Sequence, residues 1–146
     1  MSFNFSKVKW GRVILWSVLG FIIAIAIPLL YVTVRMFIIG FQIGANPGPE
    51  VQRELSSGLL YLVIWCLAMA LGGFLAGRAP ARKAEGSYLL NGLLAGLGMA
   101  ILFAVFLIVT GSSFSLIVLL WVVLAIAASA LGGWLGGRAA EAEAYI

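Results

Sequence analysis

The sequence predicts an all-α, polytopic membrane protein with a bundle of four transmembrane helices. Two tandem helical hairpins are one of the arrangements that such a bundle allows. Hydrophobic residues make up 64% of the 146 residues and charged residues 10%. A soluble domain of this size would expose a mostly apolar surface. Four apolar runs each approach the ~20 residues that cross a bilayer. A ten-residue string also occurs twice, as ALGGFLAGRA at 70–79 and ALGGWLGGRA at 130–139.

The first span is expected over residues 13–34. Its start resembles a signal peptide, but apolar sequence continues past Ala24-Ile25-Ala26, so we expect an uncleaved span. Pro28 removes one backbone hydrogen bond and is expected to kink the helix. If the helix continues to Ile43, it is too long for an upright span and must tilt or project from the bilayer.

The remaining spans are expected over 58–77, 88–110 and 115–137, within one membrane domain covering residues 1–146. Turn-forming residues dominate 46–57, which is expected to be a loop, with Ser56 or Ser57 capping the second span. The link at 110–114 is short and uncharged, so the third and fourth spans form an antiparallel hairpin.

Basic residues mark one side of the membrane. Seven of the nine precede the first span or follow the second and fourth spans, and only Arg35 and Arg53 fall on the other side. The positive-inside rule then places both termini in the cytoplasm of a multi-pass protein of the cell's inner (plasma) membrane. The net charge of +4 is therefore a topology signal, and we expect no nucleic-acid partner.

Small residues four positions apart allow helix backbones to approach closely. The candidates for helix packing are Gly72, Gly73, Gly77, Gly92, Gly96, Ala100, Gly132, Gly133 and Gly137. Most lie in the cytoplasmic half of their spans, which predicts a bundle that is narrow there and splayed outside. Ordinary membrane packing without this asymmetry is the alternative.

Large aromatic residues occupy the outer half. We expect an outer crevice lined by Trp65, Phe103, Phe106 and Trp121, suited to a lipid tail, a hydrophobic cofactor tail or a partner helix.

The sequence offers few groups for chemistry. It contains no histidine, and its five acidic residues all lie outside the apolar runs. We therefore expect no catalytic, cofactor-binding or metal-binding residues and no enzyme activity. Arg35, Arg78 and Arg138 are candidates for lipid headgroup contact. Asn91 is expected to fix helix register by hydrogen bonding across the bundle.

The repeated ending GGxxxGR and the four spans resemble small uncharacterised bacterial four-helix membrane proteins. The similarity lies mainly in residues 70–79 and 130–139, and it implies a fold without implying an activity.

The favoured function is a non-catalytic accessory or structural subunit in a larger membrane complex, such as a respiratory, photosynthetic or transport complex, or in a homo-oligomer. Its partners are then membrane lipids and other integral membrane subunits or copies of itself. A small transporter or channel with a lumen between protomers is the alternative, followed by a membrane enzyme acting on lipids.

The orientation is testable by cysteine labelling. Cysteines introduced at residues 82 and 141 should react with a membrane-impermeant reagent only from the cytoplasmic side, because the basic bias places both positions there. Modification of either position from outside would contradict this topology.

Overall fold

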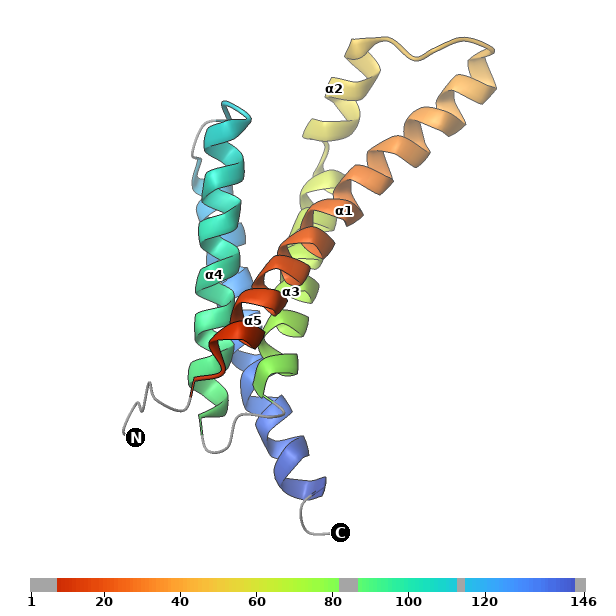
Figure 1. Cartoon of the computed structure of the whole chain (residues 1–146). Coiled ribbons are helices and arrows are strands. Elements are labelled where there is room, and N and C mark those ends of the chain that lie inside the picture. The colour runs from red at the N-terminus through yellow and green to blue at the C-terminus, as the bar shows by residue number, and fades with distance from the viewer. Residues whose placement is uncertain (1–7, 82–86, 113–114, 144–146) are drawn as a thin grey trace.

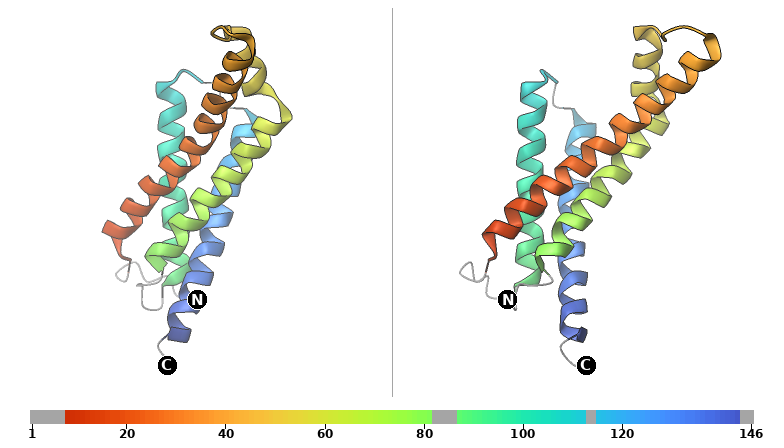
Figure 2. Two further views of the ribbon diagram at one scale, coloured as in Figure 1. Left: turned by 90° about the vertical axis from the view of Figure 1, so that its right-hand side faces the viewer. Right: turned by 45° about the vertical axis from the view of Figure 1, so that its right-hand side comes forward.

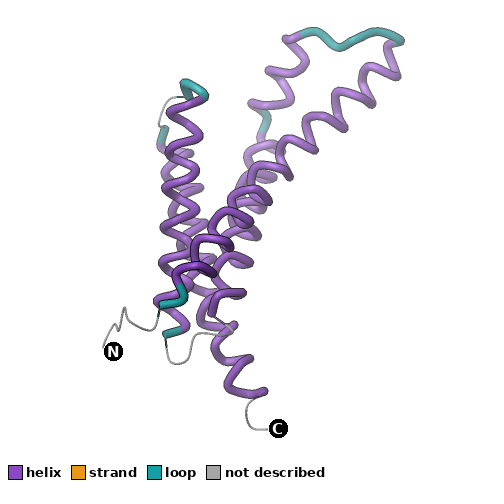
Figure 3. The backbone as a smooth tube through the Cα atoms, viewed as in Figure 1, coloured by secondary structure: helices purple, strands orange, loops and turns teal. Residues whose placement is uncertain are grey.

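Four long helices and one short helix make up the chain. The computed structural model describes residues 8–81, 87–112 and 115–143. The helices are α1 (Trp10–Ile43), α2 (Pro49–Ser57), α3 (Leu59–Ala81), α4 (Tyr88–Val109) and α5 (Leu116–Glu143). The described residues contain no strand (Figure 3). All but α2 are long and apolar enough to cross a membrane, which confirms the all-α class and the four-helix membrane bundle.

The long helices alternate in direction. The start of α1, the end of α3, the start of α4 and the end of α5 lie at one end of the bundle (Figure 1). Lys9, Arg12, Arg78 and Arg138 belong to these termini, so we name this the basic end. The other end, which carries α2, is the α2 end. Among the described residues, α3 contacts each of the other helices, whereas α1 and α5 do not touch.

Helix α1 is longer than the expected span of 13–34. It continues through Arg35 to Ile43 and ends at Gly44, whose φ of 65° is left-handed. Residues 36–43 are apolar apart from Gln42 and contain no proline, and Gly40 lacks the positive φ of Gly44, so the helix continues past Arg35 and ends only at Gly44. The longer of the two expected forms of this helix is therefore the observed one.

The expected loop over 46–57 is wrong from residue 49 onward, because Pro49–Ser57 form α2. Pro49 occupies the first turn, where its fixed φ favours a helix and its missing N–H costs nothing. Neither serine caps α3. The hydroxyls of Ser56 and Ser57 donate instead to the carbonyls of Arg53 and Glu54 within α2.

The two copies of the repeated string lie side by side on α3 and α5, which run in the same direction (Figure 2). Gly73 faces the backbone of Ala125, and Gly77 faces the backbone of Ser129. On the other helix, Gly132 faces the carbonyl of Phe74 and Gly136 that of Arg78. The glycines thus bring the two backbones into direct contact.

The other predicted glycines also lie at helix contacts in the half nearer the basic end. A Cβ on Gly92 would lie 2.9 Å from Cα of Gly133, and one on Gly96 would lie 2.8 Å from Cβ of Ser129. Gly72 faces the Gly20 carbonyl on α1, and Gly137 faces the Tyr88 ring on α4. Ala100 is half-buried on α4.

Toward the α2 end, α1 leaves α4. Figure 1 and the right-hand view of Figure 2 both show α1 diverging from α4, whereas α5 stays beside α4. The small residues Gly20 and Ala24 of α1 lie in the half nearer the basic end, and bulky residues follow Pro28. The spacing between helices thus follows the size of the facing side chains.

Replacing Gly77 by alanine should lower the free energy of unfolding by about 1–3 kcal/mol, as overpacking typically does. The added methyl group would meet the backbone of Ser129, which cannot rotate away. Thermal unfolding in detergent measures this loss.

Gly11→Ala is the matched control. Among the residues that the structure describes, a Cβ at Gly11 would meet no atom within 4 Å. Alanine should therefore leave stability unchanged or raise it by up to about 1 kcal/mol, because alanine favours helix more than glycine does. Equal behaviour of the two variants would contradict the backbone contact at Gly77.

Candidate functional site

Buried polar side chains join the helices in the half nearer the basic end. Ser17, Asn91 and Ser129 are each at most 3% exposed, and each has a hydrogen-bond partner. Buried polar groups in an apolar medium require such partners. These three residues are the candidate site, and the question is whether they act on a ligand or on the protein itself.

Ser129 forms a junction of three helices. Its hydroxyl donates to the Gly92 carbonyl on α4 at 2.7 Å. Its backbone faces Gly77 on α3, and its Cβ lies against Gly96. Because Gly77 and Gly96 lack side chains, α5 approaches α3 and α4 at the same residue. The Ser129 hydroxyl proton is donated to α4.

Ser17 joins α1 to α4. Its hydroxyl lies 2.7 Å from the Val13 carbonyl of its own helix and 3.0 Å from the Ala95 carbonyl of α4. A Cβ on Gly98 would lie 2.5 Å from this hydroxyl, so only glycine leaves room for it.

Asn91 ties the start of α1 to the start of α4. Its amide donates to the Ser87 carbonyl at 2.8 Å, and its Oδ1 accepts from the backbone N–H of Lys9 at 3.1 Å. That N–H precedes α1 and would otherwise lack a partner in the helix. The geometry agrees with a role in helix register.

The expected outer crevice is wrong, because its aromatic residues pack against one another. Trp65 and Trp121 stack with ring centroids 4.8 Å apart, and Phe103 lies 5.7 Å from Trp65 and is 1% exposed. Phe106 stacks on Phe103 at 6.4 Å and is half-buried. The large rings fill the space between α3, α4 and α5 that they were expected to line.

This aromatic cluster leaves two donors unused. The indole N–H groups of Trp65 and Trp121 are buried and have no hydrogen-bond acceptor among the described residues. An unsatisfied buried donor costs about 1–3 kcal/mol. The cluster therefore depends on ring packing for its stability, without support from hydrogen bonds.

The three arginines predicted to contact headgroups lie apart from this site. Arg35 is exposed on α1. The guanidinium of Arg78 lies 5.7 Å from the centre of the Phe74 ring, and that of Arg138 lies 4.2 Å from the centre of the Trp134 ring. Both are cation–π contacts with a residue one turn earlier, a geometry that places the charge along the helix surface. Headgroup contact remains a prediction.

Sequence reasoning treated Ser17 and Ser129 only as small residues. Ser129 lies four residues from both Ala125 and Gly133, and Ser17 lies three residues before Gly20 and seven before Ala24. Each serine thus shares a helix face with small residues, where helices approach closely and a hydroxyl reaches the neighbouring backbone. That spacing is the signal that would have identified them as interhelical donors.

The arrangement offers structural hydrogen bonds and no reactive cluster. Within residues 8–81, 87–112 and 115–143, no three His, Cys, Asp or Glu side chains lie close enough to hold a metal ion. Cys66 is a half-buried free thiol.

Comparison of the chain with protein-family models, curated proteins and solved structures gave no match.

Asn91→Leu tests the link between α1 and α4. The substitution keeps the number and branching of the side-chain heavy atoms and leaves the Lys9 N–H without its acceptor, so hydrogen exchange at residues 9–13 should become faster. The free energy of unfolding should fall by about 1 kcal/mol. Exchange measured by mass spectrometry tests this against Asn46→Leu, an exposed control. Unchanged exchange in both variants would contradict the assignment.

Proposed function

We propose that this protein is a non-catalytic integral membrane subunit that packs against other membrane subunits or against copies of itself. One observation carries the proposal. Among the described residues, the buried side chains of Ser17, Asn91 and Ser129 all bind backbone atoms of the bundle, so their hydrogen bonds serve the packing of the helices. The remaining feature available to a partner is the surface of the helices.

The outward surface of α4 supports packing over transport. Its exposed residues are apolar and recur at Leu97, Ile101, Val105 and Ile108. A lumen between protomers would need polar groups on such a face, since ions and polar solutes must replace their water of hydration. An apolar face suits a neighbouring helix or lipid.

The orientation proposed from the sequence has support in the position of the charges. Lys9, Arg12, Arg78 and Arg138 belong to helix termini that meet at one end of the bundle. A cytoplasmic basic end agrees with the positive-inside rule, and an inner (plasma) membrane is the proposed location.

Extraction into polymer nanodiscs from the native membrane tests the proposal. Native mass spectrometry should detect a fixed stoichiometry, with either identical chains or defined integral partners, and the stoichiometry should persist when the tagged chain is expressed at its natural level. A chain that is monomeric under these conditions would contradict the proposal.

A flux assay with the purified protein in liposomes addresses the alternative. The proposal expects permeability to ions and small solutes equal to that of empty liposomes. Flux that rises with the amount of correctly folded protein would replace the structural proposal by the transporter or channel.

A further inference from the structure

The end of α1 and the whole of α2 extend beyond the bundle. We name residues 36–57 the α2 arm, which comprises the last eight residues of α1, the turn at 44–48 and α2. The arm forms the upper right of Figure 1, orange to yellow. Its surface is the largest feature that the packing of the four spans does not explain.

The length of α1 places its final turns outside the hydrocarbon layer. Its 34 residues give a helix of about 51 Å. Even at a tilt of about 40°, the upper limit for membrane helices, it extends about 39 Å across a hydrocarbon layer of about 30 Å. With the start of α1 at the opposite interface, roughly eight residues must lie at headgroup level or beyond.

These final turns are nevertheless apolar on one face. Phe37 is 75% exposed and Phe41 84% exposed. They continue a stripe of exposed apolar residues that begins within the span and includes Ile22 and Leu30, and helical spacing places these four on one face, turned away from buried Ser17 and Ala24. The lipid-facing surface of the span thus continues into the arm without a polar break.

The opposite face of the arm carries polar groups. Gln42, together with Arg35 just before the arm, lies on the face of α1 that carries Ser17 and Ala24 within the bundle, and both are exposed, with Ile38 between them. On α2, Val51 and Leu55 are half-buried, whereas Gln52, Arg53 and Glu54 are exposed. An apolar face beside a charged face is typical of helices that lie in a membrane interface.

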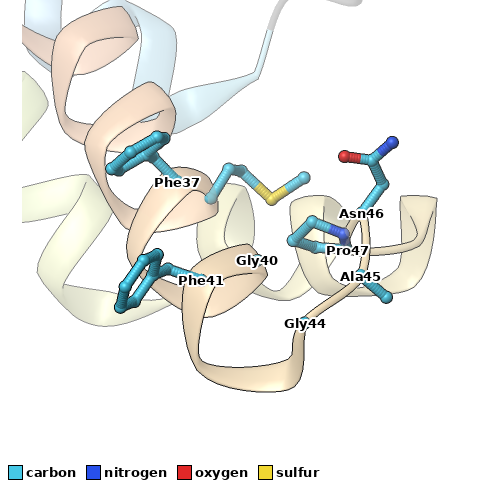
Figure 4. A pocket seen from close by; sticks show the side chains of 8 residues that line it. Phe37, Gly40, Phe41, Gly44, Ala45, Asn46 and Pro47 are labelled. Atoms are coloured by element: carbon cyan, nitrogen blue, oxygen red, sulfur yellow. The ribbon is translucent and has the colours of Figure 1, made fainter.

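An open pocket lies between the end of α1 and the turn. Met36, Gly40 and Phe41 contribute from the helix, and Ala45, Asn46 and Pro47 from the turn (Figure 4). The pocket contains no charged side chain, and the Asn46 amide is its only polar side-chain group. Its chemistry suits a hydrocarbon chain.

We propose that the α2 arm is seated in the adjacent membrane leaflet, with phospholipid acyl chains covering Phe37, Phe41 and the pocket. The polar face of α2 then meets headgroups and water. The continuous apolar stripe favours lipid as the occupant, because the same medium already covers that stripe within the span.

Depth-dependent quenching in liposomes tests the proposal. In a Cys66→Ala background, a Phe41→Cys variant carries an environment-sensitive fluorophore. Spin-labelled phospholipid should quench most of its emission, with the strongest effect from a label near the boundary between headgroups and acyl chains, and aqueous iodide should quench little of it. Gln52→Cys on the exposed face of α2 is the water-facing control, and Leu30→Cys on the exposed apolar stripe of α1 is the lipid-facing control.

Two results would overturn the proposal. Iodide quenching at residue 41 equal to that at residue 52 would place the arm in water. Protection from both quenchers, with self-quenching that rises with protein density, would show that a second protein covers the arm.

The unaltered protein provides a second measurement that does not depend on the folding of a variant. Phospholipid with a photoactivatable group on its acyl chain should form adducts within residues 36–48, located by peptide mass spectrometry. Adducts found only before residue 36 of α1 and on α3, α4 and α5 would contradict the proposal.

Discussion

Direct contact between helix backbones at the Ser129 junction is the constraint on which the bundle depends. Lipid tails are as apolar as the helix surfaces, so burial of apolar area contributes little to association, and close packing must supply it. The carbonyl of Ser129 faces Gly77, and its hydroxyl binds the Gly92 carbonyl. Three helices therefore meet at one residue, and α1 joins them through Ser17 and the contact of Gly20 with Gly72.

The rest of the molecule follows from this tight half. Toward the α2 end of α3–α5, glycine gives way to Trp65, Phe103 and Trp121, where the two indole rings stack and the Phe103 ring lies tilted against Trp65. Tyr31 of α1 lies beside Tyr61 of α3. The later aromatic rings of α1, Phe37 and Phe41, are exposed, and α1 diverges from α4. The divergence exposes Arg35 and carries the apolar end of α1 toward the membrane surface, where α2 folds back.

The number and type of the long helices followed from the lengths of the apolar runs, but several details of their ends and contacts did not. Arg35 was expected near the end of the first span, yet charge alone does not end a helix, and Gly44 does. Turn-forming composition around Pro49 obscured a helix start. The aromatic residues were correctly placed in the half away from the glycines, but whether rings line a crevice or fill it depends on their mutual orientation. The hydroxyls of Ser17 and Ser129 bind carbonyls 78 and 37 residues away.

Solid-state NMR of the unaltered protein in lipid bilayers tests the central claim most directly. Selective labelling of glycine Cα carbons gives resolved dipolar contacts between helices without any substitution. Gly92 on α4 and Gly133 on α5 are in backbone contact, so a strong correlation between their Cα carbons is the predicted result. A well-folded sample that lacks this correlation would contradict an account in which backbone contact holds the bundle together.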